Sequence, residues 1–190
     1  MSGQGPATPY FKGQARARST NFTGGHTLYK IPIIGGTPQR LIIDVDSPVS
    51  LSPDGTQLLF VRNGVANGRG DSRLFVAKED GSKERPIAVR KLPDRFLSPA
   101  WSSDGRKISV FSFGGKEERS SLVEVPSQGG QEIQLTQHQW DRALSSNWIS
   151  SGSGLVVNGR EGIGTPMQFY FVSSPDGEVR RITSDFVAAT

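Results

Sequence analysis

Two short motifs alternate along this chain at a nearly constant spacing, and this repetition constrains the fold more than any other feature. Residues 94–105 align without a gap with residues 141–152, which begin 47 residues later, and the two segments share Asp, Arg, Leu, Ser, Trp, Ser and Gly. A shorter copy of the motif occurs at residues 51–55. Self-similarity with a period of about 40–50 residues is typical of chains built from repeated structural units.

The second motif is an apolar stretch that leads into a glycine-containing turn, and it lies between copies of the first motif. Asp-Gly and Gly-Gly pairs between apolar runs favour tight β-hairpins, because Gly accepts positive φ angles without a steric clash. Each unit therefore converts into four antiparallel strands, which is the blade of a β-propeller. The four copies begin at Leu28, Leu74, Leu122 and Phe169 and lead into Gly35-Gly36, Asp80-Gly81, Gly129-Gly130 and Asp176-Gly177.

The sequence thus predicts an all-β fold, a partial β-propeller of about three and a half four-stranded antiparallel blades. A β-sandwich of unrelated hairpins would not require so regular a period. We expect Trp101 and Trp148 to pack between neighbouring blades. The expected segments are an irregular N-terminal segment at 1–25 with one candidate strand at 9–11, followed by blades over 26–190, comprising a half-blade at 28–41 and blades at 46–91, 95–136 and 142–184.

About three and a half blades are too few for a closed propeller, which typically has four to eight. The open stack would expose strand edges that tend to pair with other chains. Either the chain is part of a longer protein or it closes by pairing with another copy of itself, and the sequence favours the first.

Composition excludes several classes of function. The 190 residues include no Cys, so disulfides and thiolate metal sites are absent. The net charge of +4 comes from basic residues scattered along the chain, which does not indicate nucleic-acid binding. No apolar run approaches the length of a membrane helix and no signal peptide is recognisable, so we expect no membrane insertion and a cytoplasmic location for the chain as written.

The repeated turns resemble the TolB-like β-propeller repeat family, whose motif is Trp-Ser-Pro-Asp-Gly followed by an apolar strand. The resemblance covers about residues 26–185 and is greatest to the carboxy-terminal propellers of bacterial serine/threonine protein kinases. It implies a sensor or docking domain, periplasmic or extracytoplasmic if its parent is membrane-anchored. The matching segments are Leu51-Ser52-Pro53-Asp54-Gly55, Trp101-Ser102-Ser103-Asp104-Gly105 and, degraded, Trp148-Ile149-Ser150-Ser151-Gly152.

No catalytic constellation is recognisable in the sequence. Imidazole could come only from His26 and His138, and both are expected to be surface histidines. Neither accompanies a Gly-x-Ser-x-Gly elbow, and the chain has no Gly-x-x-x-x-Gly-Lys phosphate loop and no His-Glu-x-x-His helix. We therefore expect no enzyme activity, no metal and no cofactor.

One repeated charged feature is a candidate binding site. Asp94-Arg95 and Asp141-Arg142 occupy the same place in consecutive blades, before the innermost strand, and Asp46 holds a comparable position. Loops that enter the inner strands cluster around one mouth of a propeller channel. We hypothesise that these residues form a charged rim that docks a peptide or protein through charge-assisted hydrogen bonds. The alternative is that each Asp-Arg pair braces its own loop.

Three functions follow from this reading. The first is a non-catalytic binding propeller, a sensor or docking fragment of a larger bacterial signalling protein. The second is a substrate-gating propeller of a hydrolase similar to prolyl oligopeptidases. The third is an assembly module that forms a homodimer through its open blade edges.

Overall fold

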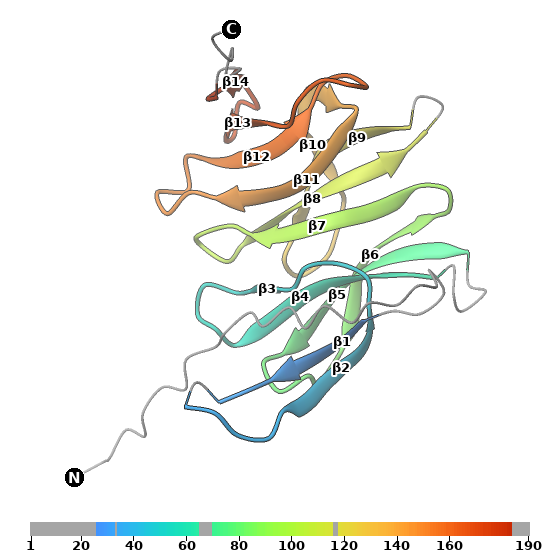
Figure 1. The fold of residues 1–190 in the computed structure, drawn as a ribbon, viewed down its shortest axis with the longest axis vertical. Helices are drawn as coiled ribbons and strands as arrows, with labels where there is room; N and C mark the ends of the chain where they lie inside the picture. The colour runs from blue at the N-terminus through green and yellow to red at the C-terminus, as the bar shows by residue number, and fades with distance from the viewer. Residues whose placement is uncertain (1–25, 33, 65–69, 116–117, 184–190) are drawn as a thin grey trace, which may run out of the picture.

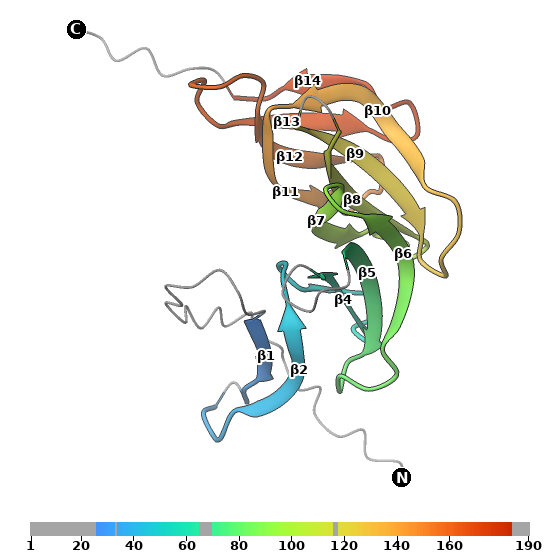
Figure 2. The same cartoon turned by 90° about the vertical axis from the view of Figure 1, so that its right-hand side faces the viewer.

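The computed structural model describes residues 26–32, 34–64, 70–115 and 118–183. The regular secondary structure in these ranges consists of β-strands alone. The strands form one two-stranded sheet and three four-stranded antiparallel sheets. The sheets follow one another along the chain and stack face to face in an open arc (Figure 1 and Figure 2). The prediction of an all-β partial propeller is confirmed.

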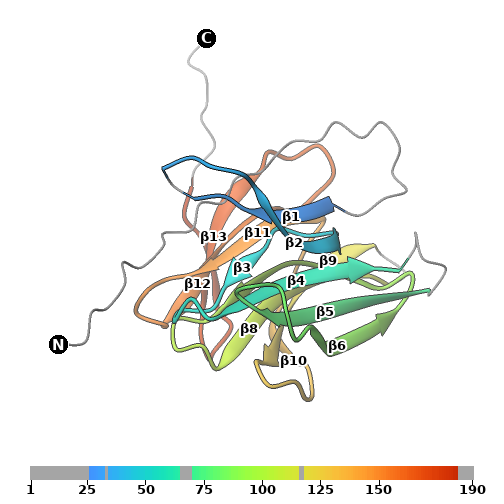
Figure 3. The same cartoon turned by 90° about the horizontal axis from the view of Figure 1, so that it is seen from below.

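Each four-stranded sheet is one blade, and its strands pair in sequence order from the inside of the arc outward, as Figure 3 shows for β3 to β6. The half-blade contains β1 (His26–Lys30) and β2 (Gln39–Val45). Blade 1 contains β3 (Ser50–Leu51), β4 (Gln57–Asn63), β5 (Asp71–Lys78) and β6 (Arg85–Lys91). Blade 2 contains β7 (Arg95–Trp101), β8 (Lys107–Gly114), β9 (Arg119–Pro126) and β10 (Ile133–Trp140). Blade 3 contains β11 (Arg142–Trp148), β12 (Gly154–Arg160), β13 (Gln168–Ser173) and β14 (Val179–Arg181).

The turn between the first two strands of a blade is built by the repeated Ser-x-Asp-Gly sequence. In blade 2, the Ser102 hydroxyl donates to Asp104 Oδ1 at 2.6 Å and accepts the Lys107 N–H at 2.9 Å. Ser52 and Asp54 form the same turn in blade 1. The serine hydroxyls, which donate to the two carboxylates, are the main reason that the pKa values of Asp54 and Asp104 lie below the ordinary aspartate value.

Apolar clusters fill the space between consecutive sheets, so each blade is held mainly by its neighbours. Trp101 is buried among residues of blades 1 and 2, and Trp148 packs against the cluster between blades 2 and 3. The Trp148 Nε1–H also donates to Ser109 Oγ of blade 2 at 3.1 Å. Both tryptophans therefore lie between blades, as the sequence predicts.

The end of blade 2 differs from the prediction. The blade was expected to end at residue 136, but β10 continues to Trp140. Gln134 pairs with Val123 and Gln139 pairs with Ser121, so residues 135–138 form a bulge in the ladder. Trp140 is fully buried, with its ring 6.0 Å from Phe111 in an edge-to-face contact. This packing continues the strand through a polar sequence that shows no strand-like alternation.

The candidate strand at 9–11 and the rest of the segment 1–25 lie outside the described residues. The domain division at residue 26 therefore stays a prediction.

Candidate functional site

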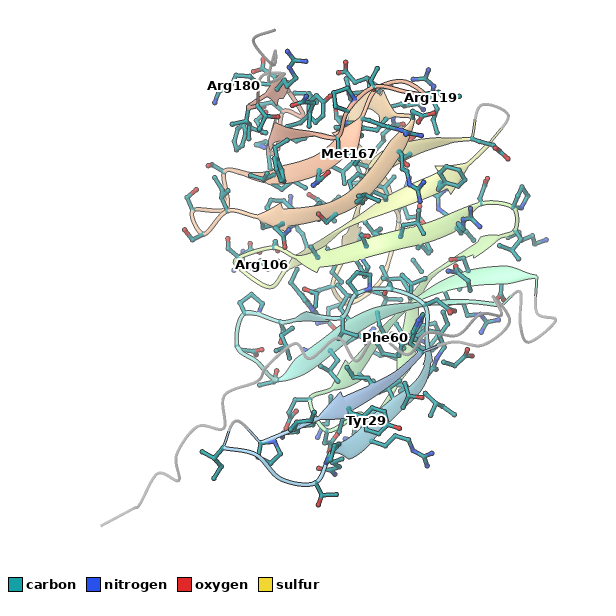
Figure 4. All side chains as sticks on the ribbon, in the orientation of Figure 1. Tyr29, Phe60, Arg106, Arg119, Met167 and Arg180 are labelled. Atoms are coloured by element: carbon teal, nitrogen blue, oxygen red, sulfur yellow. The ribbon has the colours of Figure 1, made fainter. Side chains whose placement is uncertain are left out.

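The loops that enter the first strand of each blade lie on one rim of the stack, here called the entry rim. Because the strands are antiparallel, the turns between second and third strands lie on the same rim. Figure 4 labels Arg119 at the entry rim and Arg106 at the opposite one. All five predicted site residues lie on the entry rim. Four of them lie immediately before or at the start of β7 and β11, and Asp46 lies directly after β2, in the loop that leads to β3.

The three aspartates of the predicted site each bind the end of the second strand of their own blade. Asp46 Oδ2 accepts the Asn63 N–H at 2.8 Å, and Asp94 Oδ1 accepts the Gly115 N–H at 2.8 Å. Asp141 Oδ2 accepts the Arg160 Nε–H at 2.7 Å. The acidic side chains therefore brace the entry loops, which is the structural alternative raised from the sequence.

Gly114 permits the close approach of Asp94. A Cβ atom at this position would lie 2.0 Å from Asp94 Oδ1 and 2.8 Å from Asp94 Cα, and the glycine φ is +150°. Any other side chain would displace the entry loop of blade 2.

The two arginines of the predicted site have different surroundings from the aspartates. Arg95 and Arg142 are exposed, and they start the adjacent inner strands β7 and β11. The Arg95 guanidinium lies 4.9 Å from the centroid of the Phe113 ring, which is its cross-strand neighbour. A cation over an aromatic face is held in place yet keeps its hydrogen-bond donors available. The rim thus presents guanidinium groups while its aspartates are occupied.

The inner strands are irregular just beyond these arginines. β7 bulges between Leu97 and Ala100, and β11 bulges between Ala143 and Ser145. The Ser98 hydroxyl donates to Leu144 O at 2.6 Å, so the two bulges are in direct contact. Bulges redirect side chains and are common beside functional sites. This contact fixes the spacing of β7 and β11 beneath the two arginines.

A polar hollow of about 400 Å³ opens beside the predicted residues, on blade 2 and the outer edge of blade 1. Its charged lining residues are Arg90, Asp94 and Arg119. Arg90 is paired with Glu132 of blade 2, so it also ties the two blades together. The remaining lining residues are Ser112, Gly114, Gly115, Ser121 and Gln139.

Sequence reasoning did not identify Arg90 or Arg119 as site residues. Positions that recur from blade to blade indicate a site, but the position of Arg119 is occupied by Asp71 in blade 1. A residue type that occurs at this position in only one blade is not identified by repetition.

His26 is exposed, as expected, but His138 is not a simple surface histidine. It is half-buried in the β10 bulge, with ring centroids 4.6 Å from Trp140 and 5.9 Å from Tyr170. Its Nε2 lies 3.4 Å from Glu161 Oε1, although the angles do not form a hydrogen bond. A fully surface position was expected for His138, but the β10 bulge turns its side chain toward blade 3.

In the ranges that the structure describes, no group of three or more His, Cys, Asp or Glu side chains is placed to hold a metal ion. Across those same ranges, no helix is long and apolar enough to cross a membrane.

Comparison with known sequences gives one short match. No protein-family model matches the chain. Over 65 residues, the chain is 37% identical to the Tol-Pal system protein TolB of Alkalilimnicola ehrlichii, a match that covers 34% of this chain and 15% of that protein.

Solved structures resemble the chain over most of its length. The putative TolB of Agrobacterium tumefaciens has a TM-score of 0.68 at 18% identity, over 83% of this chain and 56% of that one. TolB of Acinetobacter baumannii has a TM-score of 0.65 at 15% identity, over 83% of this chain and 37% of that one. An oligogalacturonate lyase in complex with manganese has a TM-score of 0.63 at 16% identity, over 85% of this chain and 43% of that one.

These likenesses support a TolB-like β-propeller fold. The chain covers 15% of the Alkalilimnicola ehrlichii protein, 37% of the Acinetobacter baumannii TolB and 56% of the Agrobacterium tumefaciens protein. Propellers of enzymes are among the structures that share the fold, including an acylaminoacyl peptidase with a TM-score of 0.56 at 16% identity, over 83% of this chain and 28% of that one.

Proposed function

We propose that this chain is a non-catalytic binding propeller whose entry rim docks an acidic peptide segment of a partner protein. The observation that carries the proposal is the pair of exposed guanidinium groups of Arg95 and Arg142 at equivalent positions of neighbouring inner strands. Guanidinium groups bind carboxylates through paired, charge-assisted hydrogen bonds.

The aspartates of the rim do not neutralise this pair of arginines through direct contacts. Asp94 is bound to a backbone N–H and Asp141 to Arg160, so both carboxylates are engaged within their own blades. The register places Arg142 opposite Arg160, whose guanidinium is in turn engaged by Asp141. At Arg95 and Arg142, an incoming carboxylate would therefore meet guanidinium donors that these two aspartates do not bind directly.

The hollow beside Asp94 gives the proposed ligand a second point of contact. Arg119 lines it together with the polar side chains of Ser121 and Gln139, and Gln139 donates to Ser121 Oγ at 3.1 Å. An extended peptide with spaced carboxylates could contact both Arg95 and this hollow. We therefore propose an acidic, extended segment as the ligand, rather than a small apolar molecule.

The experiment is to replace Arg95 and Arg142 together by Gln and to measure binding of a fluorescein-labelled oligoglutamate peptide by anisotropy at low salt. Loss of two guanidinium contacts should weaken binding at least about tenfold, or about 1.4 kcal/mol. Stability should stay within about 1 kcal/mol, because both side chains are on the surface.

The matched control replaces Arg106 and Arg180, two exposed arginines away from the entry rim (Figure 4), so that the net charge is the same. Equal weakening in this control would reduce the effect to net charge and contradict the proposal. Unchanged binding with lost stability in the Arg95/Arg142 variant would show that these residues only brace the fold.

A gating propeller of a hydrolase is the second candidate function, and the acylaminoacyl peptidase among the similar structures favours it. On this proposal the chain would restrict access to a catalytic domain in the same protein. Detection of a hydrolase domain in the parent sequence would support it over the docking function.

The cellular setting belongs to the same proposal. The resemblance to kinase-attached propellers leads us to propose a bacterial signalling protein as the parent. The location is then extracytoplasmic if the parent is membrane-anchored, and cytoplasmic if it is not. Cell fractionation with an antibody against the chain would separate these two locations.

A further inference from the structure

The outward face of blade 3 carries apolar residues at positions that are covered in the other blades. We call the face toward the following blade the back face, and the opposite one the front face. On the back face of blade 2, Leu122 and Leu135 are 0% and 9% exposed because blade 3 packs on them. The corresponding residues of blade 3, Phe169 and Ile182, are 45% and 51% exposed.

The front face of the half-blade has the same property at the other end of the stack. Tyr29, on β1, is 45% exposed, whereas the corresponding Tyr170 of blade 3 is 3% exposed. Tyr170 belongs to the cluster that also contains Leu122 and Leu135, so it lies at the junction of blades 2 and 3. Ile31, two residues after Tyr29, is exposed as well.

We propose that a second copy of this chain docks the front face of its half-blade onto the back face of blade 3. Tyr29 and Ile31 of one copy then cover Phe169 and Ile182 of the other. The contact between Tyr170 and the Leu122/Leu135 cluster is its template within the chain, with tyrosine at the same repeat position. Apolar side chains exposed on a sheet face mark an interaction surface.

The back face of blade 3 lacks a serine acceptor that the other blades use to bind the next inner strand. This difference favours a half-blade over a complete blade as its partner. Ser72 Oγ accepts the Phe96 N–H at 2.9 Å, and Ser120 Oγ accepts the Ala143 N–H at 3.3 Å. Each serine thus binds the inner strand of the next blade. Blade 3 has Met167 at this position, and its thioether is only a weak acceptor. The half-blade β1–β2 has no inner strand of its own in the described residues, so it does not need this acceptor.

In a pair of copies, the exposed face at each end of each stack can be covered by the other copy. Tyr29 and Met167 lie at opposite ends of the stack (Figure 4), so each copy offers one front face and one back face. A head-to-tail contact closes into a ring when the rotation is right and otherwise continues as a filament. Two copies of about three and a half blades fall within the four to eight blades of closed propellers. The inferred assembly is therefore a closed dimer.

The first test measures the solution mass of the purified 190-residue chain by light scattering after size exclusion, over a range of concentrations. The wild type should have twice the chain mass, and Tyr29→Asp or Phe169→Asp should weaken the dimer at least about tenfold. Ile163→Asp is the control, since Ile163 is exposed but lies in the loop between β12 and β13. Circular dichroism verifies that each variant remains folded.

The second test uses the absence of cysteine from the 190-residue sequence. A mixture of Tyr29→Cys and Phe169→Cys variants should form disulfide-linked pairs upon mild oxidation, much faster than either variant alone. A mixture of Ile163→Cys and Phe169→Cys is the control.

Other results would overturn the inference. A monomeric wild type would mean that the two faces do not bind each other. A polydisperse series of masses would mean that the ends pair without closing, or that they require further blades of a longer chain. Equal cross-linking in the control mixture would mean that the half-blade is not the occupant.

Discussion

Asp94 and Arg95 are neighbours in the chain, but their side chains have different surroundings, and the same holds for Asp141 and Arg142. Successive side chains of an extended strand point to opposite sides, so adjacent charges need not share partners. Asp94 binds a backbone N–H of its own blade, whereas Arg95 lies exposed over Phe113. One repeated dipeptide can therefore brace a loop and present a cation to a ligand.

The Ser-x-Asp-Gly turn leads to a prediction about pH. Hydrogen bonds from the Ser102 hydroxyl and then from the Arg106 N–H lower the pKa of Asp104 below 3.8. The stabilising contribution of a lowered carboxyl pKa is complete above the unfolded pKa and is lost as the pH falls through the folded pKa. Wild type should therefore be more stable than Asp104→Asn at pH 7, by less than about 1 kcal/mol for an exposed group, and the difference should vanish in acid. Denaturant unfolding at several pH values measures it.

The control for this prediction is the same substitution in a Ser102→Ala background. Since the serine hydroxyl is the largest cause of the lowered pKa, removing it should reduce the effect of Asp104→Asn at pH 7. An unchanged effect would assign the stabilisation to something other than this turn.

At the scale of strands, the hairpins between third and fourth strands join each blade to the preceding sheet. A Cβ atom on Gly81 would lie 2.7 Å from Leu41 O, and one on Gly177 would lie 1.9 Å from Leu135 O. Both carbonyls belong to the last strand of the preceding sheet, β2 of the half-blade and β10 of blade 2. The glycine therefore serves the turn, through its positive φ, and the junction, through its small size.

This double role predicts the effect of Gly177→Ala. Gly177 has φ +70° and a close neighbour, whereas Gly164 has φ +81° and no atom within 4 Å of a built Cβ. Gly164→Ala should cost about 1–2 kcal/mol for backbone strain alone. Gly177→Ala adds overpacking against the Leu135 carbonyl, for a total of at least about 3 kcal/mol. Denaturant unfolding of both variants tests this, and equal losses would contradict a role in the junction.

The repeat predicted the sheets well because each blade is defined by local turn chemistry and alternating apolar residues. It missed the last part of β10, because Thr136 to Gln139 shows no alternation and the strand continues only through the burial of Trp140 between blades. The position of His138 was missed for the same reason. Contacts between units depend on residues distant in sequence, and one repeat does not reveal them.

The candidate site was predictable only in part. Repetition indicated the Asp-Arg positions, and these do lie on one rim. It did not distinguish aspartates that bind Asn63 or Gly115 from arginines that remain exposed, because hydrogen bonding depends on the end of another strand. The hollow at Arg119 depends on a side chain that occurs once in the repeat.

At the scale of the whole molecule, the described residues form a linear array in which each sheet contacts only its neighbours along the chain. The stability of such an array is approximately the sum of the stabilities of its units and of their junctions. Blade 2 is covered on both faces, whereas the half-blade and blade 3 are each covered on one. The free energy of local opening should therefore be lowest at the two ends.

Amide hydrogen exchange followed by mass spectrometry measures this gradient. At low protein concentration, β8 and β9 should exchange slowest, while β1, β2, β13 and β14 should exchange faster, because the end sheets open without disrupting two junctions. If the ends pair between copies, protection of β1 and β13 should rise with concentration in the wild type, and it should not rise in Phe169→Asp. Uniform exchange in all sheets would instead show a single cooperative unit, in which the central junctions stabilise the ends as strongly as the middle.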